Sequence, residues 1–158
     1  MATVYIETSI VGYLTAHSRD SLIFQARQEL TRRWWSFSRE KYDLVASQLV
    51  LDEAAAGDAE ASKKRLQLLA GIPLLASSDP QIDSLADALL SAHLLPEKAH
   101  SDAQHVAIAA VHRVDYLLTW NCKHIANAAT LPGLYRLLTE RGYSGPLIVT
   151  PEEFSGDV

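Results

Sequence analysis

Three carboxylic acids that lie far apart in the sequence are the side chains best suited to chemistry, and they are Glu7, Glu53 and Asp102. Glu7 comes directly after the apolar run 3–6, and the hydroxyl residues Thr8 and Ser9 follow it. A carboxylate at the end of a strand is usually solvated. The alternative is a metal ligand at the mouth of a sheet, oriented by one of the two hydroxyls. On the residues alone, both interpretations stay open.

The other candidates also have two interpretations. Glu53 lies on a predicted helix over 49–56 with apolar neighbours, so it either faces water or points inward, where an unpaired charge costs several kcal/mol and needs a partner. Asp102 lies in the first turn of a helix, where the helix dipole stabilises a carboxylate, and a ligand role needs other carboxylates nearby. Asn121 follows the strand 116–120, where asparagine favours a turn.

Several kinds of site are excluded by what the sequence lacks. Cys122 is the only cysteine, which excludes an intramolecular disulfide and a cysteine-rich zinc site. No nucleophile elbow, phosphate-binding glycine loop or dinucleotide fingerprint is present. The scattered histidines do not match a zinc spacing, and we interpret these three as surface or packing residues: His105, His112 and His124.

Composition places the chain in the ordinary globular class. It has 158 residues, 48% hydrophobic and 21% charged, with a net charge of −5. The acidic balance argues against broad coating of nucleic acid but leaves room for an enzyme that grips it locally. No apolar run is long enough for a membrane span and no secretory signal is visible, so we expect a cytoplasmic protein. Trp34-Trp35 are expected to pack in a helix and Lys63-Lys64-Arg65 to form a solvated helix face.

Short apolar runs alternate with amphipathic segments along the chain. The predicted strands cover 3–6, 43–47, 72–75, 116–120 and 146–150. The predicted helices run from Ser21 to about residue 37, over 49–56, over 60–70, from the N-cap Asp79 onward, from the capping box Ser101–Gln104 onward, and over 131–141. Gly57, Gly71 and Gly142 are expected to end three of them.

This alternation predicts βαβ units, and therefore an α/β fold with a mostly parallel sheet covered by helices on both faces. Such sheets carry functional groups at the carboxyl ends of their strands. That rule selects Glu7 after the first strand and Asn121 after the fourth.

Taken together, these positions resemble the PIN-domain family, and specifically the VapC-like toxins of bacterial type II toxin–antitoxin pairs. The segments that carry the resemblance are, in order, YIETSIVGYL, SQLVLDEAAAG, SDAQHVAIAAVHRVDYLLTWNCKHIAN and IVTPEEF. The third is the most specific, because it combines an acidic helix start, a histidine three residues on, and a strand that ends in Thr-Trp-Asn. The match spans essentially the whole chain, so we expect residues 1–158 to form a single PIN-like domain.

The resemblance implies a three-layer α/β/α sandwich and an acidic cluster that holds Mg²⁺ or Mn²⁺ for hydrolysis of RNA phosphodiesters. By motif position, the catalytic residues are Glu7, Glu53, Asp102 and Asn121, with Glu7, Asp102 and Asn121 as metal ligands. Glu7 and Asp102 are expected to hold the first metal, while Glu53 and Asn121 position water or help to hold a second. The family usually has aspartate in place of Glu7 and often in place of Asn121, whose amide is a weaker ligand than a carboxylate.

The resemblance also implies partners. These are an RNA substrate, a second copy of the chain in a homodimer, and a small antitoxin protein whose tail offers Arg or Lys to the carboxylates. A non-enzymatic alternative is a weakened domain that binds RNA or a protein without cleaving. A receiver-like signalling domain is set aside, because it needs an acidic pair after the first strand and an aspartate after the third, which here ends in Leu75-Ala76-Ser77.

Overall fold

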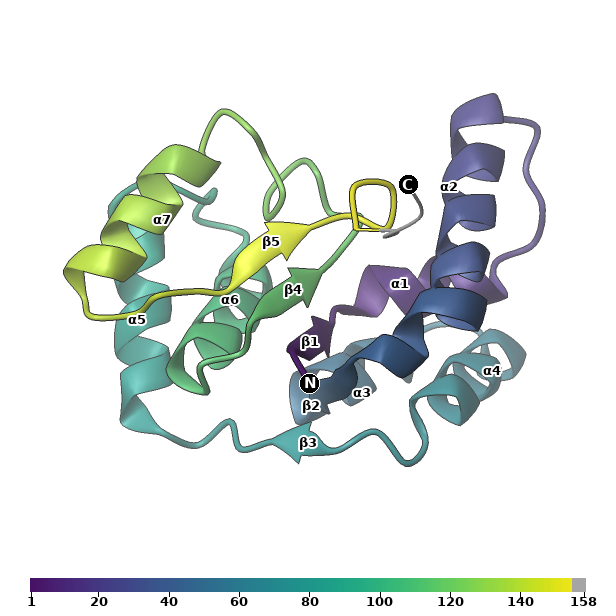
Figure 1. The fold of residues 1–158 in the computed structure, drawn as a ribbon, viewed down its shortest axis with the longest axis horizontal. Coiled ribbons are helices and arrows are strands. Elements are labelled where there is room, and N and C mark those ends of the chain that lie inside the picture. The colour runs from purple at the N-terminus through teal and green to yellow at the C-terminus, as the bar shows by residue number, and fades with distance from the viewer. Residues whose placement is uncertain (155–158) are drawn as a thin grey trace.

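The computed structural model describes residues 1–154 and contains one five-stranded sheet in which every pairing is parallel. The strand order is β3-β2-β1-β4-β5 (Figure 1). The strands are β1 (Thr3–Ile6), β2 (Asp43–Ser47), β3 (Leu74–Leu75), β4 (Tyr116–Leu118) and β5 (Leu147–Val149). β1 lies at the centre, where Tyr5 pairs with Val45 of β2 and Leu117 of β4.

Helices fill the connections between the strands. They are α1 (Thr8–Thr15), α2 (Leu22–Arg33), the π-helix η1 (Trp34–Ser38), the 3₁₀ helix η2 (Arg39–Lys41), α3 (Gln48–Ala54), α4 (Ala59–Leu69), α5 (Pro80–Ser91), α6 (His100–Val111) and α7 (Leu131–Glu140). α1 packs against α2, α3 and α4, and α5 packs against α6. Figure 1 shows α5 and α7 on the left of the sheet and α1, α2 and α4 on the right.

The strand order explains these two groups of helices. The chain adds β2 and β3 on one side of β1, and then returns to add β4 and β5 on the other side. Because crossovers between parallel strands are right-handed, the helices before β3 and those after it cover opposite faces. The predicted α/β/α layering is therefore confirmed. The order reverses between β1 and β4, which is where sheets of this kind form a crevice for ligands.

Most helices and strands lie where they were predicted, and several of their ends are set by capping residues and glycines. Ser21 caps α2 by accepting from the backbone N of Phe24, and Asp79 caps α5 by accepting from the backbone N of Gln81. Gly57 and Gly142 adopt φ of 86° and 88° beyond α3 and α7, a conformation that costs glycine little. Pro73 precedes β3, which is an edge strand, where a proline is tolerated.

Three local predictions were wrong or incomplete. The capping box at Ser101 does not form, because α6 begins earlier, at His100, with Ala99 at the N-cap position and no side-chain cap. Helix α1 was not predicted, and it begins directly after Glu7. The helix from Ser21 changes to π geometry at Trp34, which is buried and stacks on Tyr42, as expected for a packing residue.

The core is built around β1, β4 and α6. Val4, Tyr5 and Ile6 are fully buried, as is most of α6 between Ala103 and Ala110. A helix that is apolar around most of its surface is buried on most sides, so α6 packs as part of the core beside the central strands. No helix within the described part of the chain has the length and hydropathy to cross a membrane.

Candidate functional site

Glu7 links the ends of the two central strands. It follows β1, serves as the N-cap of α1, and is only 5% exposed. Its Oε2 accepts a hydrogen bond from the backbone N of Ser9 at 3.1 Å. Its Oε1 accepts from the Ser9 hydroxyl and from the Thr119 hydroxyl beyond β4, each at 2.5 Å. The backbone N of Trp120 in turn donates to Ser9 Oγ at 2.8 Å, so the carboxylate is held by both strand ends.

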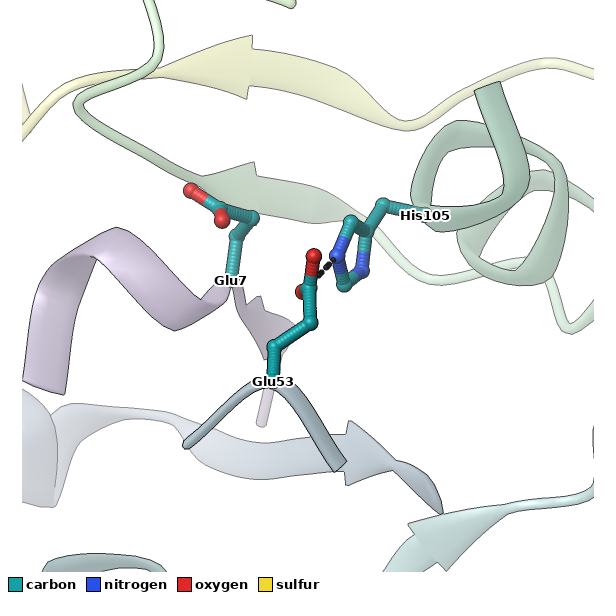
Figure 2. Close-up of side chains that lie close together, drawn as sticks. All are labelled: Glu7, Glu53 and His105. Atoms are coloured by element: carbon teal, nitrogen blue, oxygen red, sulfur yellow. Dashed lines mark hydrogen bonds and ion pairs between the residues drawn. The ribbon is translucent and has the colours of Figure 1, made fainter. Parts of the chain in front are cut away.

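Glu53 approaches from helix α3, and its side chain is 33% exposed. Its Oε1 accepts from the Thr8 hydroxyl at 2.6 Å and pairs with Nε2 of His105 at 2.6 Å. In Figure 2 the Glu53 carboxylate lies between Glu7 and the imidazole ring, which projects from α6. Three different connections between strands thus bring these side chains together at one edge of the sheet.

The two carboxylates are held in the same way. In each, Oε1 accepts from two side-chain donors: Ser9 and Thr119 for Glu7, and Thr8 and His105 for Glu53. In Glu7 the other oxygen, Oε2, accepts only the backbone N–H of Ser9. In Glu53, Oε2 accepts no hydrogen bond from the residues that the structure describes. Donors of this kind orient a carboxylate and leave its second oxygen available for another ligand.

Behind Glu53, a buried row of hydrogen bonds crosses β1. The Tyr5 hydroxyl lies 2.7 Å from Nδ1 of His105 and 2.7 Å from Oγ of Ser47, the N-cap of α3. Tyr5, His105 and Ser47 each have no exposed surface, and the rings of Tyr5 and His105 meet edge to face. Since buried polar groups need partners, this row fixes the imidazole in one orientation.

The ionisation of Glu53 determines which group donates in its hydrogen bond with the imidazole of His105. Burial alone would raise the pKa of Glu53, but the hydrogen bond and charge of His105 and the hydroxyl of Thr8 outweigh it and lower that pKa. Glu53 is therefore ionised near neutral pH and can only accept. It follows that Nε2 of His105 carries a proton and donates to Glu53. Burial also raises the pKa of Tyr5, which keeps its hydroxyl protonated within the row.

The donor set suits a hard divalent cation. Atoms of Glu7, Glu53 and His105 lie within 4.8 Å of one another, a geometry that can hold a metal ion. Mg²⁺ and Mn²⁺ prefer carboxylate oxygens, and in each carboxylate Oε2 accepts no side-chain hydrogen bond from the described residues. The imidazole is less suitable, because its Nε2 already donates to Glu53. We therefore assign the oxygens as ligand atoms and His105 as the residue that orients one of them.

The other two predicted residues lie in a different arrangement. Asp102 Oδ2 is bonded to Nδ1 of His124 at 2.9 Å, and Asn121 Oδ1 accepts from the backbone N of the same histidine at 3.0 Å. Asn121 thus forms the turn that its residue type favours. Within residues 1–154, the cluster with ligand atoms inside 4.8 Å does not include Asp102. Roles for Asp102 and Asn121 in metal binding remain predictions from the motif.

Sequence reasoning missed the importance of two residues, His105 and Tyr5. A signal was present for both. His105 is a polar residue in a helical segment that is otherwise mostly alanine, valine and isoleucine, and Tyr5 stands between Val4 and Ile6 in a buried strand. Each needed a buried partner. The partner itself could not be found, because the two residues are 100 positions apart. Thr8 or Ser9 was predicted to orient Glu7; Ser9 is the one that contacts Glu7, and Thr8 contacts Glu53.

Comparison with known proteins supports the fold. No family model and no curated protein sequence matches this chain. Among solved structures, the chain is similar to a chain in the crystal structure of VapBC2 from Rickettsia felis, bound to a DNA fragment from their promoter. The TM-score is 0.50 with 13% sequence identity, and the match covers 94% of this chain and 98% of that chain. At this identity the likeness concerns the fold alone, and it agrees with the predicted PIN-like α/β class.

Proposed function

We propose that this protein is a metal-dependent endoribonuclease of the VapC-like kind, which hydrolyses RNA phosphodiester bonds. The observation that carries the proposal is the convergence of the two oriented carboxylates of Glu7 and Glu53 beyond the carboxyl ends of the central strands. The fold similarity to the VapBC2 structure supports the same function.

Mg²⁺ or Mn²⁺ would be held by Glu7 and Glu53, and the motif adds Asp102 as a third ligand. The metal would polarise the phosphoryl group and generate a nucleophile from water near neutral pH. The residues of the chain supply the geometry. Ser9 and Thr119 orient the carboxylate of Glu7, and His105 and Thr8 orient that of Glu53. Such orientation by hydrogen-bonded neighbours is worth about 10- to 100-fold in metal affinity or activity.

The partners belong to the same proposal. We propose that a small antitoxin protein inhibits the enzyme by presenting Arg or Lys to the acidic cluster, where charge-assisted pairs form readily. The structurally similar chain comes from VapBC2 bound to promoter DNA, and this supports a protein partner of the antitoxin kind. A homodimer is proposed from the resemblance, and light scattering of the purified chain tests it.

Cleavage of a labelled RNA by the purified chain is the direct test. We expect cleavage with Mn²⁺ or Mg²⁺, loss of cleavage with excess EDTA, and recovery when the metal is restored. RNA that stays intact at every metal concentration, in protein that is folded and free of antitoxin, contradicts the enzymatic proposal.

A second candidate function is an RNA- or protein-binding domain that does not cleave. It is favoured by the amide at Asn121, which leaves one carboxylate fewer than the usual motif, and by the pairing of Asp102 with His124 outside the carboxylate cluster. The same assay distinguishes the candidates, because a binding domain retains the RNA without releasing products.

A further inference from the structure

Helix α2 buries polar side chains and exposes apolar ones, which reverses the usual pattern of a surface helix. The residues that α2 buries are Gln28, which donates to two backbone carbonyl oxygens at 2.9 Å each, and Thr31. On the outer side of α2 and its extension η1, Leu22, Ile23 and Phe37 are 85%, 70% and 71% exposed. The apolar side of a helix normally faces a core. This side therefore fits a helix that is covered by another molecule.

The exposed side chains follow the spacing with which two helices pack along each other. Steps of three and four residues keep side chains on one side of a helix and form the contact line of paired helices. Such steps run along α2 into η1, and the residues at them are the α2 stripe: Ile23, Ala26, Leu30, Arg33 and Phe37. Leu30 is half-buried and the other four are exposed. Figure 1 shows that α2 stands at one end of the molecule, so a second helix can reach the stripe.

The apolar area of the stripe suits the centre of a small interface. Leucine, isoleucine and phenylalanine exposed to this degree present on the order of 300 Å² of apolar surface to water. Patches of about 300–600 Å² are the largest on a typical monomer and are often functional. A stable interface covers about 800 Å² on each partner, with a polar rim around an apolar centre. With its polar flanks, the stripe reaches the low end of that range, which predicts an association that depends on concentration.

The stripe is complementary to itself. Its charged member, Arg33, already pairs with Glu29 of the same helix at 3.0 Å, so charge does not select an acidic or a basic partner. Its two large ends, Ile23 and Phe37, are each seven residues from Leu30. In a twofold-symmetric dimer the same surface of each copy meets the other. Two antiparallel helices that cross at Leu30 thus place Ile23 against Phe37 of the second copy, twice.

We propose that two copies of this chain dimerise through the α2 stripe, with the two α2 helices antiparallel. The inference rests on the homodimer of the proposed function and names the surface that forms it. It does not depend on nuclease activity, because the α2 stripe contains none of the residues proposed to bind the metal.

A charge placed in the stripe gives the first test. Sedimentation equilibrium of the purified full chain, free of antitoxin and measured from low to high micromolar concentration, gives the dissociation constant of the dimer. We expect Ile23→Glu and Phe37→Glu each to raise it about tenfold or more, because each substitution enters a symmetric interface twice and buries a charge there. Ile23 lies in the first turn of α2, where a carboxylate stabilises the helix, so Ile23→Glu should fold.

Leu147→Glu is the matched control. Leu147 is 53% exposed on β5, outside the stripe, and the substitution changes the net charge equally. Its dimer should have the dissociation constant of wild type. Equal weakening by all three substitutions would show a general effect of charge and would overturn the assignment of the stripe.

Crosslinking tests the antiparallel orientation. Ile23→Cys and Phe37→Cys are made in a Cys122→Ser background, mixed in equal amounts and treated with a short bismaleimide. We expect the crosslinked product that joins one copy of each variant to exceed its share in a random mixture. Products that mainly join two copies of the same variant would overturn the antiparallel arrangement.

The outcomes separate this inference from the proposed function. Wild type that stays monomeric at every concentration overturns both the stripe and the homodimer, whether or not the chain cleaves RNA. A dimer that persists unchanged in Ile23→Glu and Phe37→Glu overturns the stripe alone and leaves the homodimer to another surface. If those two variants dimerise like wild type but fail to bind an antitoxin, the stripe belongs to that partner and the proposal is overturned.

Discussion

Two groups of polar side chains meet near the carboxyl ends of β1 and β4, and they are organised differently. In the first group, Glu7 and Glu53 are each held through one oxygen by two side-chain donors, and the second oxygen is left available. In the second group, Asp102 is paired with His124, and the amide of Asn121 is used to form a turn. The first arrangement brings two carboxylates and an imidazole within reach of one cation, whereas the second pairs a single carboxylate with a histidine.

The difference shows that acidic residue type alone does not define a metal ligand. All three acids fit the motif and each has a donor on one oxygen, yet only Glu7 and Glu53 belong to the cluster whose ligand atoms lie within 4.8 Å of one another. Orientation by neighbouring donors is what lowers the entropic cost of assembling a metal site. Asp102 lies outside this cluster and is held by His124 through Oδ2, so the effect of His124 on metal binding can be measured.

The largest effects are expected at the oriented carboxylates. Glu7→Gln and Glu53→Gln each remove a charged ligand and place an amide NH₂ among groups that already donate. We expect RNA cleavage to fall more than about 100-fold, beyond the range for neighbours of a ligand. Initial rates with Mn²⁺, together with calorimetric titration of Mn²⁺, check this.

Asp52→Asn is the matched control for Glu53→Gln. Asp52 is the preceding residue on α3, is exposed, and accepts a hydrogen bond from Gln48. It loses the same charge at nearly the same position, so its rate should stay close to that of wild type. Glu53→Gln protein that cleaves as fast as this control would remove Glu53 from the mechanism.

The buried row behind Glu53 should matter next most. His105→Leu removes the donor to Glu53 at similar volume, and we expect a loss of about 10- to 100-fold in Mn²⁺ affinity. Tyr5→Phe keeps the ring but loses the contact with Nδ1, and should cost less. Nitrogen NMR of the imidazole distinguishes this positioning role from general destabilisation, because Tyr5→Phe should change the Nδ1 signal of His105 in protein that remains folded.

An unchanged imidazole spectrum and unchanged Mn²⁺ affinity in Tyr5→Phe would show that the row does not orient His105. Ser47→Ala is the milder comparison, since Ser47 contacts the Tyr5 hydroxyl and caps α3 but does not contact the imidazole in the described hydrogen bonds. Loss of that cap typically costs about 1 kcal/mol of stability. Metal affinity should therefore fall less in Ser47→Ala than in Tyr5→Phe.

Much of this arrangement was predictable, and the exceptions have physical causes. The strands and the helices with Ser21 and Asp79 caps follow from local residue preferences. Helix α1 was missed because its cap is a glutamate, outside the usual capping residues, and because Gly12 lowers its helix propensity. The strand-end rule selected Glu7 correctly for the edge of the sheet. The pairing of Tyr5 with His105 depends on tertiary packing, which no local pattern encodes.

Asp102 is expected to show a smaller effect than the oriented carboxylates. If it joins the metal site, Asp102→Asn should weaken Mn²⁺ binding about tenfold, the lower end of the range for supporting groups. His124→Ala should then leave binding unchanged or tighten it, because Oδ2 of Asp102 is released from its histidine partner and both carboxylate oxygens can turn toward the metal. A cycle of both single variants and the double variant measures the coupling. Weaker Mn²⁺ binding in His124→Ala would instead make the histidine a necessary support of Asp102.

The free energy of unfolding should depend on pH, with a modest contribution from Glu53. Because its pKa is lowered in the folded protein, the stabilising contribution is full above the ordinary glutamate pKa and is lost as pH falls through the lowered value. Urea unfolding of wild type and Glu53→Gln, compared between about pH 7 and about pH 3, checks this. The free-energy difference between the two proteins should shrink on acidification. A difference that grows on acidification would contradict the assigned direction of the pKa shift.

Asn121 should give the smallest effect, and it tests whether charge or geometry limits the second group. Asn121→Asp keeps an oxygen that can accept from the backbone N of His124, now as a charge-assisted bond, so the turn is retained. The added charge offsets the repulsion between two divalent ions, and a second Mn²⁺ should bind a few-fold tighter, with faster cleavage at limiting Mg²⁺. Asn121→Ala loses the turn bond and should lower stability by about 1 kcal/mol while changing the first metal site little. Calorimetric titration of Mn²⁺ into the three proteins measures both sites. Two equally tight sites in the wild type would show that the amide is no handicap, and that the motif's usual fourth carboxylate is dispensable in this chain.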